Sequence, residues 1–160
     1  MRTIIYPNFV GGRGALGLLV LRLVMGAAFI LHGWPKIQNA FHWMDHMPDV
    51  PIPPPYLQAL AALAEFGGGI GLILGFLTPL AALGIACNMV VAISMVHVPH
   101  DHPFVALKPG GPSFELAAGY LADAILLLLA GPGMLSLDGL LFRPRSRPED
   151  TPGGQLVMRR

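Results

Sequence analysis

The sequence contains one cysteine, Cys87, and neither a CxxC motif nor a cysteine pair. The chain alone therefore cannot close an internal disulfide or carry dithiol chemistry. Charged residues are also scarce, because Asp, Glu, Lys and Arg make up 12% of the 160 residues. That share is about half of what soluble domains carry. The net charge of +1 excludes the strongly basic surface that nucleic-acid binding needs, so we expect no nucleic-acid partner.

Apolar residues are abundant instead and account for 54% of the chain. Four apolar runs approach membrane-spanning length, at about residues 14–31, 56–77, 80–98 and 113–130. About 20 helical residues cross about 30 Å of hydrocarbon. The composition therefore predicts an all-α protein, a bundle of four transmembrane helices in contact with the lipid bilayer. The first run is long for a signal peptide and no small-residue cleavage site follows it, so we interpret it as an uncleaved helix.

The chain divides into three predicted parts. Residues 1–13 form an N-terminal cytoplasmic segment, and residues 14–142 form the membrane domain with a C-terminal interfacial segment at 134–142. Residues 143–160 form a basic, mobile tail. Arginines gather before the first run and after the fourth, which places both termini in the cytoplasm by the positive-inside rule. The residues His32 to Lys36, HGWPK, contain the glycine and proline that we expect to end the first helix.

One strongly polar residue interrupts each apolar run: Arg22, Glu65, Asn88 and Asp123. Counting about 1.5 Å per residue from the expected helix starts puts all four near the middle of the membrane. Ionisable groups are costly there, so they usually face a partner or a cavity. We therefore predict a buried polar cluster in which Arg22 holds a carboxylate in a bidentate pair. Such a cluster could bind a ligand or relay a proton, or could only hold the helices in register, and the sequence leaves these alternatives open.

Glycines surround Glu65. Gly67, Gly71 and Gly75 form a small-xxx-small series, which typically lets helices pack closely. We expect this series to bring another helix against the one that carries Glu65.

Histidines and other polar residues gather near the expected outer loops, where His32, Lys36, His97 and Glu115 are candidates for an outer-surface site. His42 and His46 have the spacing of one helix face, and His100 and His102 follow His97 closely. Imidazole is a good ligand for zinc, copper and iron. No thiolates or recognised ligand signature accompany these histidines, so we predict no metal site.

Three stretches carry a family resemblance: LRLVMGAAFILHGWPKI, AEFGGGIGLILGFLTPLAALGIACNMVVAISMVH and FELAAGYLADAILLLLAGPGMLSLDGLL. In these the chain resembles DoxX-type membrane proteins over roughly residues 15–142. The resemblance implies a multi-pass protein of the bacterial or archaeal cytoplasmic (inner) membrane, with a link to respiratory or redox chemistry. It assigns no catalytic roles. The positions that match the family pattern are Arg22, His32, Gly33, Lys36, Glu65, Asn88, His97, Glu115 and Asp138.

These observations lead to one main functional hypothesis. The chain would be an integral membrane subunit of a respiratory or redox complex, with a quinone site at the Arg22, Glu65, Asn88 and Asp123 cluster. The sequence has no haem, flavin or iron–sulfur ligation pattern, so this chain supplies no cofactor itself. Electrons would come from other protein subunits, and the chain would not be catalytic alone. The alternatives are a non-catalytic membrane anchor or assembly subunit, and a small transporter.

Overall fold

The computed structural model describes residues 9–45, 47 and 50–142. The described residues form helices and connecting turns with no strand, which confirms the all-α prediction. The tail at 143–160 and most of the predicted N-terminal segment lie outside the described residues. In chain order the elements are α2 (Gly12–Gln38), α3 (Pro55–Leu74), α4 (Thr78–Ala92), the π-helical turn η1 (Ile93–His97), the 3-10 turn η2 (Val98–His100), α5 (Glu115–Ala130) and α6 (Leu137–Phe142).

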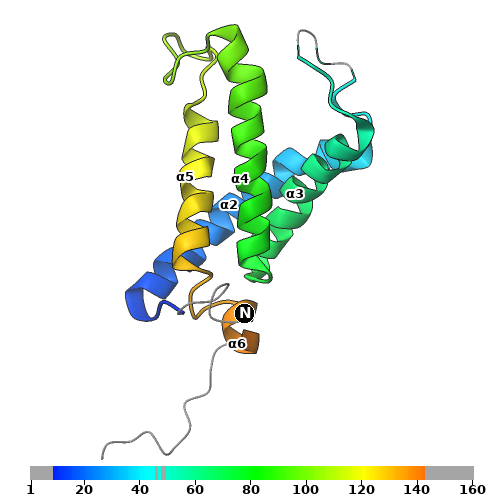
Figure 1. The fold of residues 1–160 in the computed structure, drawn as a ribbon. Helices are drawn as coiled ribbons and strands as arrows, with labels where there is room; N and C mark the ends of the chain where they lie inside the picture. The colour runs from blue at the N-terminus through cyan, green and yellow to red at the C-terminus, as the bar shows by residue number, and fades with distance from the viewer. Residues whose placement is uncertain (1–8, 46, 48–49, 143–160) are drawn as a thin grey trace, which may run out of the picture.

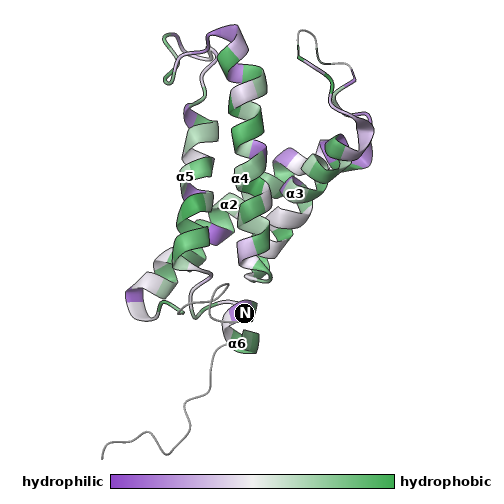
Figure 2. Cartoon of the chain, in the orientation of Figure 1, coloured by the Kyte–Doolittle hydropathy of each residue, from purple (hydrophilic) through white to green (hydrophobic). Residues whose placement is uncertain are grey.

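Three helical segments are long and apolar enough to cross a membrane: Gly12–Gln38, Pro55–Leu74 and Thr78–His100. α5 is also strongly apolar but has 16 residues, or about 24 Å of helix. It therefore falls short of that length, and a fourth span stays a prediction. Large apolar side chains such as Val24, Leu80 and Leu129 are exposed, as lipid contact requires. Hydrophobic residues predominate along the long helices (Figure 2).

The helices form two pairs (Figure 1). α3 and α4 meet in a tight turn at the lower end of the view and diverge from it, α2 packs along α3, and α5 packs along α4. α2 runs obliquely behind the α4–α5 pair. Buried apolar side chains from all four helices fill the centre: Met25, Phe29, Leu72, Ile85 and Leu127.

Glycines let α2 and α3 cross closely. A Cβ added at Gly26 would lie 2.7 Å from the carbonyl oxygen of Gly69, and one at Gly33 would lie 2.5 Å from the backbone nitrogen of Phe66. Backbones this close pack well without a hydrophobic driving force, which is absent between helices in lipid. The predicted close packing is therefore present. Gly26, Gly33 and Gly69 make the α2–α3 crossing, and in the Gly67 series Gly71 lies against Ala81 of α4 and Gly75 against Arg22 of α2.

The prediction that HGWPK ends the first helix was wrong. α2 continues through Pro35 to Gln38, which makes it 27 residues and about 40 Å long. Proline removes one intrahelical hydrogen bond and usually breaks a helix. Here tertiary contacts beyond Pro35 hold the last turn, because Lys36 is tied to α3. Lys36 therefore lies on the same helix as Arg22 but far from it, which changes the predicted polar cluster.

α6 and its preceding loop pack under the α3–α4 turn. The Asp138 carboxylate accepts hydrogen bonds from the backbone N–H groups of Leu77 at 2.9 Å and Thr78 at 2.8 Å, and so caps the start of α4. The N–H of Asp138 donates to the carbonyl of Gly75 at 2.8 Å. Asp138 is fully buried, while Leu140 and Leu141 beside it are exposed. The segment predicted to be interfacial is thus anchored to the bundle by a buried carboxylate.

Candidate functional site

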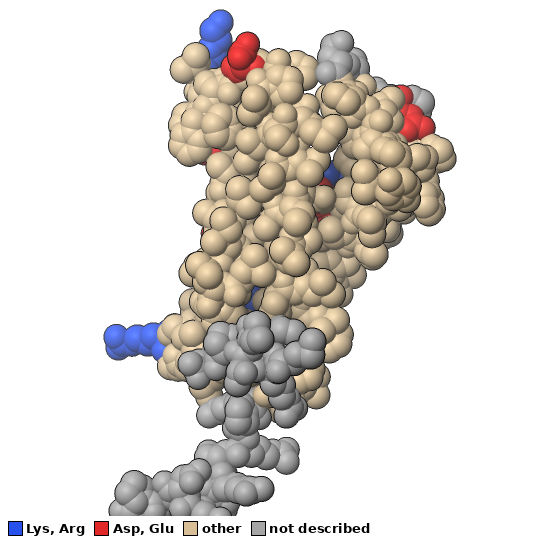
Figure 3. Space-filling model, in the orientation of Figure 1, with Lys and Arg blue, Asp and Glu red and all other residues tan. Residues whose placement is uncertain are grey.

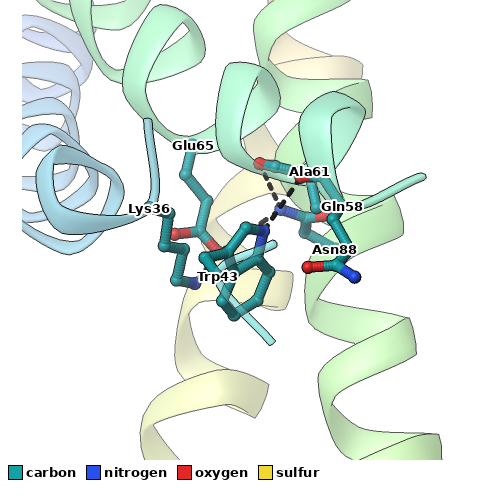
Figure 4. Close-up of polar contacts among 6 residues, drawn as sticks. All are labelled: Lys36, Trp43, Gln58, Ala61, Glu65 and Asn88. Atoms are coloured by element: carbon teal, nitrogen blue, oxygen red, sulfur yellow. Dashed lines mark hydrogen bonds and ion pairs between the residues drawn. The ribbon is translucent and has the colours of Figure 1, made fainter. Parts of the chain in front are cut away.

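Lys36, Glu65 and Asn88 come together from the three helices α2, α3 and α4 (Figure 4). The ammonium of Lys36 donates to Oε1 of Glu65 at 2.6 Å. The Asn88 amide donates to the same oxygen at 3.3 Å and to the carbonyl of Ala61 at 3.0 Å. Glu65 is 5% exposed, so its charge is compensated by one cation and one amide inside the protein.

The other oxygen of Glu65, Oε2, is buried and has no hydrogen-bond partner among the described residues. Buried carboxylate oxygens normally accept at least one hydrogen bond. Oε2 is therefore an unsatisfied acceptor within the site.

The loop between α2 and α3 folds over this group. The Lys36 ammonium lies 4.5 Å from the centre of the Trp43 ring, a cation–π distance. Trp43 donates from Nε1 to the carbonyl of Gln58 at 3.0 Å, and the Gln58 side chain accepts from the N–H of Met44 at 2.9 Å. Gln58 is almost fully buried, and these bonds fix the loop against the start of α3.

A cavity of about 540 Å³ opens beside these residues, within the size range of small-molecule sites. We call it the polar cavity. Its walls are mostly apolar, and Lys36, Glu65, Asn88 and Gln58 supply its polar groups. In Figure 3 this face of the chain is largely uncharged between its two ends, and small areas of charged atoms show from recesses. The remaining wall residues include Trp43, Met44, Met47, Leu57, Cys87, Val91 and Met95.

The prediction that Arg22 holds a carboxylate of the Glu65, Asn88 and Asp123 cluster was wrong. Arg22 is fully buried at the opposite end of the bundle, where it donates to the carbonyl of Leu135 and interacts electrostatically with Asp138. Its Nε and Nη1 have no hydrogen-bond partner in the described part of the chain. Arg22 and Lys36 are about 21 Å apart along α2. The depth estimate failed because it assumed that the helix ends before Lys36.

Asp123 does not join Glu65 either. It lies on α5, where it lines a shallow pocket of about 360 Å³ together with Glu115 and Tyr120. Glu115 is exposed in the first turn of α5, where the helix dipole favours a negative charge. Of the predicted cluster, the structure therefore brings together Glu65 and Asn88, and separates Arg22 and Asp123 from them.

The described histidine candidates occupy three separate places. His32 is exposed near the rings of Phe29 and Tyr120, at 6.5 and 6.4 Å between ring centres. His42 lies in the α2–α3 loop, 2.9 Å from the Asp45 carboxylate. The Nδ1 atoms of His97 and His102 lie 3.0 Å apart at the end of η1. Among the described residues no three His, Cys, Asp or Glu side chains are arranged to hold a metal ion. His46 lies outside the described residues.

Lys36 was expected at the outer surface, and Trp43 and Gln58 were not among the predicted site residues. Gln58 had a usable signal, because it precedes Glu65 by seven residues and so lies on the same helix face. Trp43 had none, since its position depends on how a long loop folds. Lys36 and Glu65 form an ion pair, with Asn88 as a neighbouring hydrogen-bond donor, beside the mostly apolar walls of the polar cavity. This arrangement suits a neutral ligand with carbonyl or hydroxyl groups.

Comparison with known proteins agrees with the resemblance in the sequence. The DoxX family model matches residues 17–98. The inner membrane protein YqjF of Escherichia coli is 32% identical over 79% of this chain and 92% of its own length. The inner membrane protein YphA of the same organism is 32% identical over 86% of this chain and 99% of its own length.

A third relative carries a functional name. "Putative oxidoreductase CatD" of Bacillus subtilis is 27% identical over 80% of this chain and 89% of its own length. No solved structure matches the chain significantly. The apolar helices and the inner-membrane relatives together identify a multi-pass protein of the cytoplasmic membrane. Since the family model covers more than half of the sequence and two relatives align over nearly their whole length, this chain belongs to the DoxX family.

Proposed function

We propose that this protein is a small membrane subunit of a redox complex and that its polar cavity binds the ring of a quinone. The observation that carries the proposal is the Lys36–Glu65 ion pair, which leaves the buried Oε2 of Glu65 unpaired among the described residues and which lies in the wall of a mostly apolar cavity. An ionisable group buried at such a place in a membrane protein usually marks a ligand or proton site. The relative named as an oxidoreductase favours a redox role over other ligand-binding roles.

The donors in the cavity fit a quinone. A bound quinone would supply two-electron, two-proton chemistry, with electrons delivered by a partner protein. Lys36 and Asn88 donate hydrogen bonds, which ring carbonyls accept, and Glu65 offers an acceptor for a ring hydroxyl. Lys36 and Glu65 carry opposite charges, so the site as a whole favours a neutral ligand over an ion. Trp43 and the methionines provide polarisable walls for a flat ring.

Glu65 is also placed to hold a proton for the reaction. Its Oε1 is engaged by Lys36, while its Oε2 has no partner in the described chain. A carboxyl that takes or gives a proton from Oε2 can keep its position through the bond at Oε1. Lys36 therefore acts as a positioning residue for Glu65 and as a donor toward the ligand.

The proposed topology has four spans with both termini in the cytoplasm. α5 would be the fourth span, since it packs antiparallel to α4 and is apolar apart from Glu115 and Asp123. Fusions of green fluorescent protein and alkaline phosphatase to the C-terminus test this. The topology requires fluorescence without phosphatase activity, and active phosphatase would exclude it.

Quinone binding to the purified full-length chain in lipid nanodiscs tests the function. Titration with a soluble short-tailed quinone should saturate for the native protein. Glu65→Gln and Lys36→Met should weaken binding by about tenfold each, because each removes a charge-assisted hydrogen bond. Asp123→Asn is the matched control, since it neutralises a carboxylate outside the polar cavity. Equal binding by all four proteins, or none by the native protein, would refute the proposal.

A further inference from the structure

A second hollow lies beside the polar cavity. It is an apolar groove of about 420 Å³ between α3 and α4, which extends toward the turn that joins them. We call it the α3–α4 groove. Glycines Gly67 and Gly71 line it on α3, and exposed leucines such as Leu63 and Leu74 stand around it. No charged residue lines the groove, so it faces the hydrocarbon of the bilayer.

The groove and the polar cavity adjoin, because Leu60, Ala64 and Gly84 line both of them. Polar groups lie in the cavity beside Trp43, and the neighbouring groove is apolar. Side by side, the two hollows match a ligand with a polar ring and a long apolar chain.

We propose that the α3–α4 groove holds the isoprenoid tail of the quinone, and that the ring enters the polar cavity sideways from the bilayer. The inference rests on the proposed function. The hydrophobic effect contributes little to binding of the tail in this groove, because lipid tails are as apolar as the groove walls. Its contribution is therefore steric: it gives the tail a path out of the protein while the ring is bound.

The charges of the cavity favour a quinone over a phospholipid as the occupant. A phosphate would bring a negative charge beside Glu65, whose cation Lys36 is already paired. A neutral ring carries no such cost. A phospholipid chain lying in the groove without its headgroup in the cavity is the competing occupant, and the experiment distinguishes the two.

Gly67→Leu closes the groove with little change elsewhere. A Cβ at Gly67 would meet only the end of the Leu63 side chain, at 3.2 and 3.9 Å, and that end can move. Gly17→Leu is the matched control, because a Cβ at Gly17 meets nothing within 4 Å and residue 17 is exposed on α2. Both variants add the same side chain to a lipid-facing helix.

Cys87 provides a native reporter, since it is the one cysteine of the chain and lines the polar cavity. Its alkylation rate by N-ethylmaleimide is measured in nanodiscs of a single phosphatidylcholine. The protection by a fully substituted benzoquinone without a tail, which has no open ring carbon for the thiol to add to, is compared with that by the same ring carrying an isoprenoid tail in place of one substituent. Glu65→Gln should reduce protection by both compounds.

We expect Gly67→Leu to weaken protection by the tailed quinone about tenfold or more, and to leave protection by the tail-less ring unchanged. Gly17→Leu should change neither. Equal effects of Gly67→Leu on both compounds, or on neither, would overturn the tail assignment while leaving ring binding intact. Absence of protection by either compound in the native protein would instead refute the proposed function. If phospholipid chains alone fill the groove, the tail will not alter protection in any variant, which also overturns the assignment.

Discussion

Replacing Lys36 by methionine tests the ion pair at the centre of the site. Methionine keeps most of the length of the side chain, but removes the cation that lies 2.6 Å from Glu65 and over the Trp43 ring. Breaking a buried ion pair from one side costs about 3–5 kcal/mol, because the remaining charge is left uncompensated. We expect the lower end, about 3 kcal/mol, since the Lys36 side chain is 24% exposed and Asn88 still reaches the carboxylate.

A double-mutant cycle separates the pair from its surroundings. Glu65→Leu alone should cost less than Lys36→Met, because Lys36 is partly exposed and can turn toward the membrane surface. The double variant should be no less stable than Lys36→Met alone. We therefore expect a coupling free energy of about 2 kcal/mol between the two positions.

The free energy of unfolding is measured by titration with sodium dodecyl sulfate in mixed micelles, with helical ellipticity as the signal. Lys36→Met combined with Asp123→Asn is the control cycle, since these residues share no contact in the described structure. If the effects of Lys36→Met and Glu65→Leu add within about 0.5 kcal/mol, the ion pair contributes nothing to the free energy of unfolding, which would refute the expected coupling.

Three further predictions concern the fold that supports the site. Asp138→Ala removes the cap of α4 and the partner of Arg22 and should lower the free energy of unfolding by about 2–3 kcal/mol, whereas Asp123→Asn should change it by less than about 0.5 kcal/mol in the same assay. Gly26→Val should separate α2 from α3 and cost about 3 kcal/mol or more, with a loss of monodisperse protein in size-exclusion chromatography; native elution would contradict the close crossing. Gly75→Ala should be strongly destabilising because φ is +63° there and the new Cβ would overlap the Arg22 guanidinium. Arg22→Ala should relieve part of that effect, and an unchanged penalty in the double variant would exclude the steric explanation.

The helical architecture could be predicted from the sequence because the signal is strong and local. Apolar runs of membrane-spanning length have few alternatives, since unpaired backbone groups are not tolerated in lipid. The end of α2 could not be predicted, because proline usually ends a helix and Pro35 therefore indicated an end that the structure does not have. Tertiary contacts overrode it: Lys36 in the turn beyond Pro35 is bonded to Glu65 of a different helix.

The composition of the candidate site was predictable only in part. Glu65 and Asn88 were recognised as costly polar groups at membrane depth, and the structure joins them. The choice of cation depended on the relative axial positions of two helices, and an error of seven residues in the position of the end of α2 exchanged Lys36 for Arg22. Arg22 was expected at the centre of the cluster, whereas its actual neighbours, Leu135 and Asp138, follow α5 and are distant in sequence.

Photolabelling of the native protein tests directly whether a quinone ring binds in the polar cavity. The native protein in nanodiscs is irradiated with a tritiated azidobenzoquinone, and labelled peptides are identified by mass spectrometry. We expect labels on cavity residues such as Met44, Met95 and Cys87. Excess unlabelled quinone should reduce this labelling, and so should Glu65→Gln. Labels confined to α5 and α6, or labels that excess quinone does not reduce, would contradict it.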